Sequence, residues 1–171
     1  VLLGLPWGRK SKVRKDIAAV IVEPVVGNMG SKHKYNYTVM GDMVNLASRL
    51  EGANKAYDTF LMVSAATVDK LDGEFDVREL DRIAVMGKDQ AVTVFEILDE
   101  KGKTDPAWLA RARKFEEGLA LYRAKDFAAA QAIFEANASD PTSQIYVERC
   151  KLFMAEPPGA GWDGVWRMKE K

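Results

Sequence analysis

The sequence predicts an α+β fold in which a small sheet is followed by a group of helices. Before residue 100, short apolar and β-branched runs alternate with amphipathic segments. Two of these runs flank a glycine turn, which is typical of an antiparallel hairpin. After residue 105 the composition changes to alanine, arginine, glutamate and aromatic residues at helical spacing. Strands mixed with helices and then helices alone indicate the α+β class.

The expected elements before residue 100 follow from apolar runs and their flanking residues. Strands are expected at residues 16–26, 35–40, 60–63, 75–85 and 91–98. Pro24 bends or ends the first strand, and 27–30 is expected to form a turn because it contains two glycines. Asp42 is a suitable N-cap for a helix that reaches about Ala56, and Ser64 caps a short second helix.

A charged segment, residues 99–106, is the expected boundary between the sheet part and the helices. Two helices separated by a turn at 125–126 are expected from the spacing of apolar residues, namely Trp108, Phe115, Leu119, Tyr122, Phe127, Ala130, Ile133 and Phe134. A third helix is expected at 142–154, ended by the prolines at 157–158. The tail, 157–171, is expected to dock through its tryptophans or to fray.

The helical segment, residues 105–156, resembles a single tetratricopeptide-type unit. Tyr122, Ala130, Phe134 and Pro141 carry this resemblance, with a spacing slightly shorter than the repeat of about 34 residues. Such units bury their faces on neighbours, and about three are needed for a stable array. A helical cap folded on the sheet part is therefore favoured over a peptide-binding array, while a protein partner for this segment stays open.

The composition excludes several classes of protein. Lysine plus arginine equals aspartate plus glutamate at 25 each, so the charge favours no nucleic-acid partner. A single cysteine, Cys150, excludes an internal disulfide and a cysteine-rich zinc site, and it fits a reducing cytoplasmic setting. The longest apolar run, 17–26, is too short to cross a bilayer. The chain does not begin with methionine and is expected to be part of a longer protein, whose upstream part could carry a membrane anchor. His33 and the basic cluster at 9–15 are interpreted as exposed loop residues.

The most informative segment is 37–51, because it places an amide and a guanidinium one helical turn apart. Asn45 and Arg49 are four residues apart just after Gly41, so a helix would carry both on one face. A guanidinium beside a neutral amide suits the negative charge that develops on a transferring phosphoryl group. The alternative is that Asn45 bonds local backbone and Arg49 forms an ordinary surface ion pair.

The same segment closely resembles the signature helix of the class III nucleotidyl cyclases, the adenylate and guanylate cyclases. The family pattern V-x-G-x-x-V-N-x-A-x-R is matched without a gap by Val39, Gly41, Val44, Asn45, Ala47 and Arg49. Similar motifs occur at 26–31, 49–52 and 78–81, in the order expected for the family. The resemblance implies that 25–100 is the C-terminal part of a ferredoxin-like cyclase domain, preceded by a divergent segment at 1–24.

The resemblance also implies an activity and site residues. Class III adenylate cyclases are phosphorus-oxygen lyases that convert ATP to cyclic AMP and pyrophosphate for intracellular signalling. In the family an asparagine orients the ribose and an arginine stabilises the transition state, and Asn45 and Arg49 match these two positions. Thr38 matches the base-selecting position and suits adenine, although it could also be a strand residue without a special role.

Further substrate contacts are expected from Gly41 and Asp42 and from Lys88. Lys88 is the cation nearest to the position where the family usually has a lysine that contacts the triphosphate, and Met86 occupies that position here. Triphosphate binding is therefore expected to be weaker than in typical members.

The two aspartates that hold two Mg²⁺ or Mn²⁺ ions in the family have no match. Asp16 imitates one of them, but only about ten residues separate it from the turn at 27–30, too few for the intervening helix and hairpin. The metal ligands would have to come from another cyclase domain in a head-to-tail dimer, and a homodimer would lack them. The chain alone is expected to be inactive. The alternative from another class is a non-catalytic regulatory or dimerisation module with a helical segment that binds a partner.

Overall fold

The structure is a computed structural model that describes residues 25–31, 34–40, 42–84 and 91–166. Several predicted features lie outside these residues. They are the strand residues 16–24, the basic cluster at 9–15, and His33, Gly41, Met86 and Lys88. The described part contains strands and helices in the order expected for an α+β protein, so the predicted fold class is confirmed.

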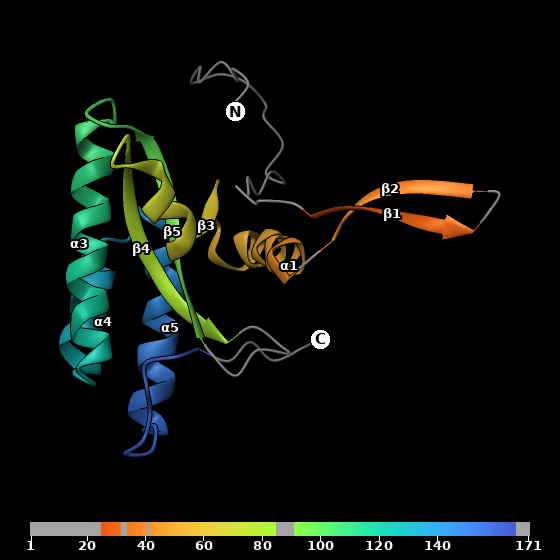
Figure 1. The fold of residues 1–171 in the computed structure, drawn as a ribbon. Helices are drawn as coiled ribbons and strands as arrows, with labels where there is room; N and C mark the ends of the chain where they lie inside the picture. The colour runs from red at the N-terminus through yellow and green to blue at the C-terminus, as the bar shows by residue number, and fades with distance from the viewer. Residues whose placement is uncertain (1–24, 32–33, 41, 85–90, 167–171) are drawn as a thin grey trace.

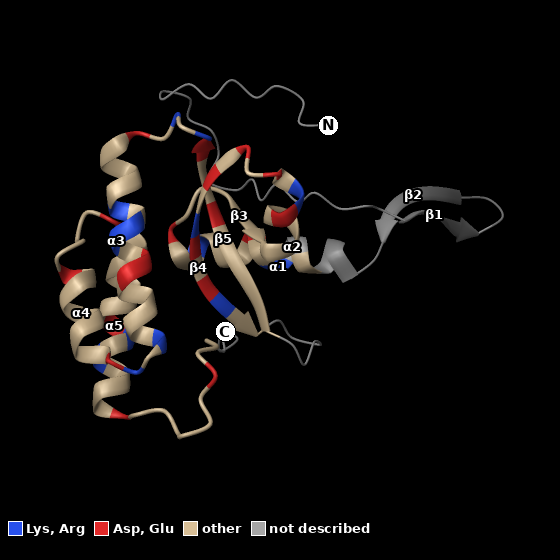
Figure 2. Ribbon diagram, turned by 60° about the vertical axis from the view of Figure 1, so that its left-hand side comes forward, with Lys and Arg blue, Asp and Glu red and all other residues tan. Residues whose placement is uncertain are grey.

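The larger sheet is antiparallel and consists of β3 (Met62–Ser64), β4 (Phe75–Ala84) and β5 (Ala91–Glu100), in the order β3-β5-β4. The long pairing of β4 with β5 confirms the predicted hairpin strands, and β3 corresponds to the run predicted at 60–63. Two register shifts interrupt the β4–β5 ladder. Figure 2 shows acidic and basic residues along β4, where a strand between layers would ordinarily be apolar.

A second sheet contains only β1 (Val25–Ser31) and β2 (Lys34–Met40), which form an antiparallel hairpin that leads into the first helix (Figure 1). The turn predicted at 27–30 is wrong, because these residues pair with 35–38 inside the hairpin. The antiparallel register continues through both glycines, because Gly27 pairs with Thr38 and Gly30 pairs with Tyr35 of β2. The reversal of the chain falls after Ser31 instead.

Helix α1 (Asp42–Tyr57) confirms the helix predicted from Asp42 to about Ala56. Among the α1 side chains that the structure describes, the buried apolar ones recur at helical spacing and are Leu46, Leu50, Ala53 and Tyr57. The short helix α2 (Ala65–Val68) and a 3-10 turn, η1 (Asp69–Leu71), follow β3.

The three C-terminal helices are α3 (Pro106–Arg123), α4 (Phe127–Glu135) and α5 (Pro141–Ala155). Each begins after an aspartate whose carboxylate accepts hydrogen bonds from backbone N–H groups of the first turn; these caps are Asp105, Asp126 and Asp140. The predicted positions of all three helices are confirmed. Figures 1 and 2 show α3, α4 and α5 gathered on one side of the sheet.

One hydrophobic core joins the helical segment to the sheet and to α1. Its buried members come from every layer and include Leu50, Leu80, Val94, Phe115, Tyr146 and Cys150. Aromatic side chains dominate the helical side, where Tyr146 contacts Phe115, Tyr122 and Phe134 with ring centroids 5.0–5.2 Å apart. The shared core agrees with the predicted helical cap. Cys150 is buried within it, and burial raises the pKa of its thiol to about 12.

The tail docks on the same body as far as Trp166. Trp162 packs against Tyr122 and Phe127, and Trp166 forms an isolated parallel bridge with Ile83 of β4. The backbone N–H of Trp166 donates to the carbonyl oxygen of Arg82 at 2.9 Å. Within the described ranges, no helix has both the length and the apolar composition that a bilayer span requires.

Candidate active-site helix and its supports

Helix α1 carries the central pair of predicted site residues. Asn45 and Arg49 lie one turn apart on it, and the Arg49 side chain is exposed, whereas Leu46 and Leu50 next to them are buried. The side chain of Asn45 lies outside what the structure describes. An exposed guanidinium on a helix whose other face is fixed in a core is suited to meet a ligand or a partner domain.

The other predicted substrate residues are placed only in part. Thr38 lies in β2, where it pairs with Gly27 of β1, and Asp42 is the first residue of α1. Gly41 and Lys88 lie outside the described residues, so the predicted triphosphate contact stays a prediction. Thr38 therefore lies near the end of strand β2, and Asp42, Asn45 and Arg49 lie in the first two turns of helix α1.

The C-terminal end of α1 is held by a buried charged network. The hydroxyl of Tyr57 donates a hydrogen bond to Asp81 of β4, and both side chains are buried. Arg149 of α5 donates from Nη1 to Asp81 Oδ2 at 2.6 Å and from Nη2 to the Tyr57 hydroxyl at 2.9 Å. Burial, and then the charge of Asp81, raise the pKa of Tyr57, so this phenol stays a neutral donor.

Aromatic rings surround the guanidinium of Arg149. Its Cζ lies 4.1 Å from the ring centroid of Trp166, 4.8 Å from that of Tyr146 and 5.1 Å from that of Tyr57. Burial opposes the charge, but the oxygens of Tyr146, Tyr57 and Asp81 outweigh it, so the pKa of Arg149 is raised. The cation is therefore permanent and tightly enclosed.

A second buried arginine, Arg78 of β4, forms a network beside the first. It donates from Nε to Glu96 at 2.7 Å, from Nη1 to Asp140 at 2.8 Å and from Nη2 to Thr142 at 3.1 Å. Thr142 in turn donates to the backbone carbonyl oxygen of Tyr57 at 2.9 Å. Burial raises the pKa of Glu96, against the opposing charge of Arg78.

Sequence reasoning missed both networks. The motif at 78–81 contributed to the family resemblance, but nothing indicated that its charges are buried. No local signal distinguishes Arg78 and Asp81 from the other charged residues of β4, which are Asp76, Glu79 and Arg82. The partners of Arg78 and Asp81 lie more than 60 residues away, Asp140 at the N-cap of α5 and Arg149 within α5, and both look like ordinary surface residues in the sequence.

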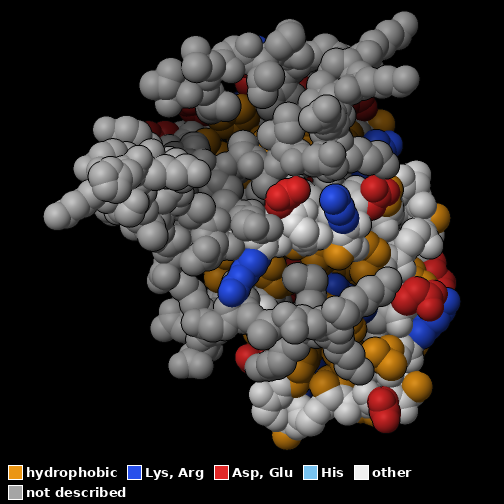
Figure 3. All heavy atoms as spheres, turned by 90° about the vertical axis from the view of Figure 1, so that its right-hand side faces the viewer, with side chains coloured by type: hydrophobic (Ala, Val, Ile, Leu, Met, Phe, Trp, Pro, Cys, Tyr) orange, Lys and Arg blue, Asp and Glu red, His pale blue; other side chains and the backbone are white. Residues whose placement is uncertain are grey.

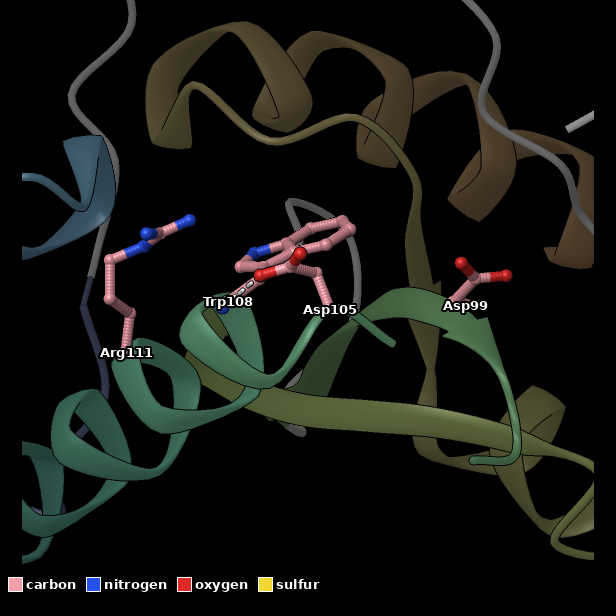
Figure 4. Close-up of a pocket in the computed structure, with 4 residues that line it drawn as sticks. All are labelled: Asp99, Asp105, Trp108 and Arg111. Atoms are coloured by element: carbon pink, nitrogen blue, oxygen red, sulfur yellow. Dashed lines mark hydrogen bonds between the residues drawn. The ribbon is translucent and has the colours of Figure 1, made fainter. Parts of the chain in front are cut away.

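A small pocket lies at the beginning of α3 and is lined by Asp99, Asp105, Trp108 and Arg111 (Figure 4). Its volume is about 200 Å³, which is below the range of about 300–1,000 Å³ that drug-sized ligands occupy. Asp105 accepts hydrogen bonds from the N–H groups of Ala107 and Trp108, at 3.0 and 3.3 Å. Its carboxylate is thus used as a helix cap.

Among the residues that the structure describes, no group of three or more histidine, cysteine, aspartate or glutamate side chains could hold a metal ion. On the face shown in Figure 3, acidic and basic described side chains are interspersed. This distribution agrees with the zero net charge.

A family model described as "Adenylate and Guanylate cyclase catalytic domain" matches residues 20–97. This part of the chain is similar to the catalytic domain of the class III cyclases. The match contains Thr38, Asn45 and Arg49 and the strands of both sheets up to Ile97 of β5. It ends before α3, so the tetratricopeptide resemblance of the helical segment has no support from it.

Three curated relatives are adenylate cyclases. The terminal-differentiation specific adenylate cyclase of Dictyostelium discoideum is 27% identical over 152 residues, which cover 83% of this chain and 7% of that protein. Adenylate cyclase 1 of Rhizobium meliloti is 40% identical over 74 residues, or 43% of this chain and 11% of that protein, and adenylate cyclase of Anabaena cylindrica is 36% identical over 76 residues, or 43% and 15%. The chain thus spans less than a sixth of these relatives. The Dictyostelium match covers enough of this chain to include α3 and α4.

Solved structures with detectable likeness include the adenylyl cyclase CyaB from P. aeruginosa. It is 30% identical, with a TM-score of 0.39, over 47% of this chain and 40% of that chain. A bacterial light-regulated adenylyl cyclase is 28% identical, with a TM-score of 0.38, over 43% of this chain and 21% of that chain. At these TM-scores the overall structures agree only in part.

Proposed function

We propose that this chain is a part of an adenylate cyclase that contributes the ribose-orienting asparagine and the transition-state arginine to an active site shared with another cyclase domain. The observation that carries the proposal is the pair Asn45 and Arg49 on α1, within the part that matches the cyclase catalytic domain, with Arg49 exposed on a helix anchored by its buried face. The curated relatives named above are adenylate cyclases, which favours ATP as the substrate.

The proposed reaction forms a bond between the ribose 3′-oxygen and the α-phosphorus of ATP and breaks the bond from that phosphorus to the leaving pyrophosphate. Negative charge grows on the α-phosphoryl oxygens during this in-line displacement. The guanidinium of Arg49 would donate hydrogen bonds to these oxygens, and Asn45 would hold the ribose so that its 3′-oxygen is aligned. Thr38 would bond the adenine edge, while Gly41, Asp42 and Lys88 would border the substrate. Divalent cations, when bound by the other domain, would help to activate the 3′-oxygen.

The chain alone is proposed to be inactive, because neither of the two aspartates that hold the metal ions in the family has a match in its sequence. A head-to-tail dimer with a cyclase domain that retains its metal-binding aspartates would complete one active site. The helical segment is proposed to be a cap that belongs to this unit rather than a peptide-binding array, since its core is continuous with that of the sheet.

A complementation experiment tests this function. The chain is mixed with a class III cyclase domain that keeps its metal-binding aspartates but has alanine at its own asparagine and arginine positions. With ATP and Mn²⁺, cyclic AMP is expected from the mixture and from neither protein alone. Arg49→Ala should lower the rate of the mixture by about 10²–10³-fold, as loss of one transition-state donor does elsewhere.

Lys55→Ala is the matched control, because Lys55 is an exposed cation on the same helix near its end. It should leave the rate unchanged. A mixture that works equally well with Arg49→Ala would remove the site assignment, and a chain that pairs with cyclase domains without ever restoring turnover would favour a non-catalytic module.

A further inference from the structure

We propose that Arg149, outside the part that matches the cyclase domain, is a positioning residue that fixes helix α1 and thereby the placement of Arg49. The proposal deepens the proposed function and rests on it for its catalytic meaning. It gives the helical segment a role within the active site's own framework: α5 would hold the helix that meets the nucleotide.

Two hydrogen bonds from α5 meet at Tyr57, the last residue of α1. Arg149 binds the Tyr57 hydroxyl, and Thr142, two turns earlier on α5, binds the Tyr57 carbonyl oxygen. A helix end attached through both its side chain and its backbone is restricted in position and in rotation about its own axis. Asp81 completes the attachment by accepting from both Tyr57 and Arg149.

The attachment is rigid because the guanidinium is enclosed. Trp166 of the docked tail covers it at 4.1 Å, and Arg149 itself is only 6% exposed. The planar group donates two hydrogen bonds in fixed directions while its faces contact rings, which a lysine ammonium cannot do. The tail, α5, β4 and α1 therefore meet at a single side chain.

A displacement at Tyr57 would reach Arg49 through the helix. The two residues are eight positions apart, which corresponds to about 12 Å along a helix that rises 1.5 Å per residue. Between them, Leu50 and Ala53 rest in the core and serve as the pivot. A small tilt of the anchored end would thus move the guanidinium of Arg49, and misplacements of about 1 Å can cost about 10²-fold in rate.

The first test measures the mechanical link without any catalysis. Hydrogen exchange of the backbone amides is followed by mass spectrometry in the full chain and in Arg149→Lys, which keeps the charge but loses the fork and the stacking. Amides of α1 at residues 50–57 should exchange at least about tenfold faster, whereas those of α4 should be unchanged. Equal exchange in α1 would overturn the inference, whatever the activity.

Arg123→Lys is the matched control. Arg123 donates to Glu79 at 2.6 Å and so joins α3 to β4 instead of α5 to α1, and both side chains are a quarter exposed. Its α1 exchange should equal that of the unchanged chain. Tyr57→Phe, which removes only one hydroxyl, provides a second and milder variant in case Arg149→Lys does not fold, and it should accelerate exchange in the same residues.

The second test uses the complementation assay to separate positioning from stability. Well below the unfolding temperature, Arg149→Lys and Tyr57→Phe should lower kcat by about 10- to 100-fold, with KM for ATP within about twofold. Arg123→Lys should change neither. A kcat equal to that of the unchanged chain, despite faster exchange in α1, would show that Arg149 only stabilises the fold and would overturn the inference. If the unchanged chain does not complement at all, the proposed function fails. The hydrogen-exchange experiment then still tests whether Arg149 fixes helix α1.

Discussion

Arg78 and Glu96 face each other across the β4–β5 ladder, and the guanidinium Nε lies 2.7 Å from the carboxylate Oε2 with both side chains almost completely buried. Asp140 binds the same guanidinium from the loop before α5. One strand residue thus forms ion pairs with two buried carboxylates that come from different layers.

Replacement of Arg78 by methionine should therefore be severely destabilising. The variant leaves Glu96 and Asp140 buried without their partner, a situation that typically costs about 3–5 kcal/mol. Arg123→Met, at a partly exposed pair, should cost no more than about 1 kcal/mol. Urea unfolding monitored by tryptophan fluorescence measures both values, and similar costs would contradict the view that burial decides the outcome.

Gly118 of α3 is required for the contact between α3 and α4. A Cβ at this position would lie 2.7 Å from Cε1 and 2.9 Å from Cζ of Phe134. Phe134 is fully buried and is held by rings of Phe115 and Tyr146, so it has no room to move. We expect Gly118→Ala to destabilise the chain by about 1–3 kcal/mol in urea or thermal unfolding.

Gly52→Ala is the control for helix propensity. Gly52 lies inside α1, and a Cβ there would meet nothing within 4 Å. The added methyl should stabilise the chain by about 0.5–1 kcal/mol, since alanine loses less entropy in a helix than glycine. Gly118→Ala is expected to lower the free energy of unfolding and Gly52→Ala to raise it. A stabilising Gly118→Ala would show that α3 and α4 are less closely packed than described.

Asp76 of β4 should make stability depend on pH in the acid range. Its carboxylate accepts from the Thr104 hydroxyl at 2.8 Å and from the Gly102 N–H at 3.1 Å, and Lys101 lies 3.1 Å away. The Thr104 hydrogen bond is the main cause that lowers the pKa of Asp76 below 3.8, against the opposing effect of burial. The folded state therefore releases this proton more readily than the unfolded state does.

Because the pKa of Asp76 is lower in the folded state than in the unfolded state, the folded state should lose stability as the pH falls. The ionised carboxylate contributes fully above the ordinary value of 3.8, and the contribution is lost as the pH falls through the lower folded value. Asp76→Asn should cost about 1–2 kcal/mol at neutral pH, and the gap to the unchanged chain should close in strong acid. Urea unfolding at a series of pH values checks this, and a gap that does not vary with pH would refute the assignment.

Local patterns predicted most of the fold. The cap at Asp42 placed α1 within a residue or two, and the spacing of apolar residues between Trp108 and Phe134 placed α3 and α4. The hairpin of β1 with β2 was predicted less well, because its two glycines look like a turn in sequence but are paired in space.

The candidate site could be predicted as a motif but not as a supported structure. Asn45 and Arg49 are four residues apart, so their relation on α1 follows from the sequence. The attachment of that helix depends on Asp81 and Arg149, which are 68 positions apart, and no local pattern links such residues. The two partners of a buried ion pair are brought together only by the folded chain. The periodicity of a sequence shows only which face of a helix or strand is apolar.

The pairing of Trp166 with Ile83 has a consequence for the behaviour of the molecule in concentrated solution. β4 is the outer strand of its sheet, and an open strand edge is a template on which another polypeptide can add and aggregate. By occupying the carbonyl of Arg82 and the N–H of Ala84, the docked tail blocks the last part of this edge. A chain that ends at Val165 would leave these groups open but keep Trp162 packed on the core, so a loss of solubility in that chain would point to strand addition.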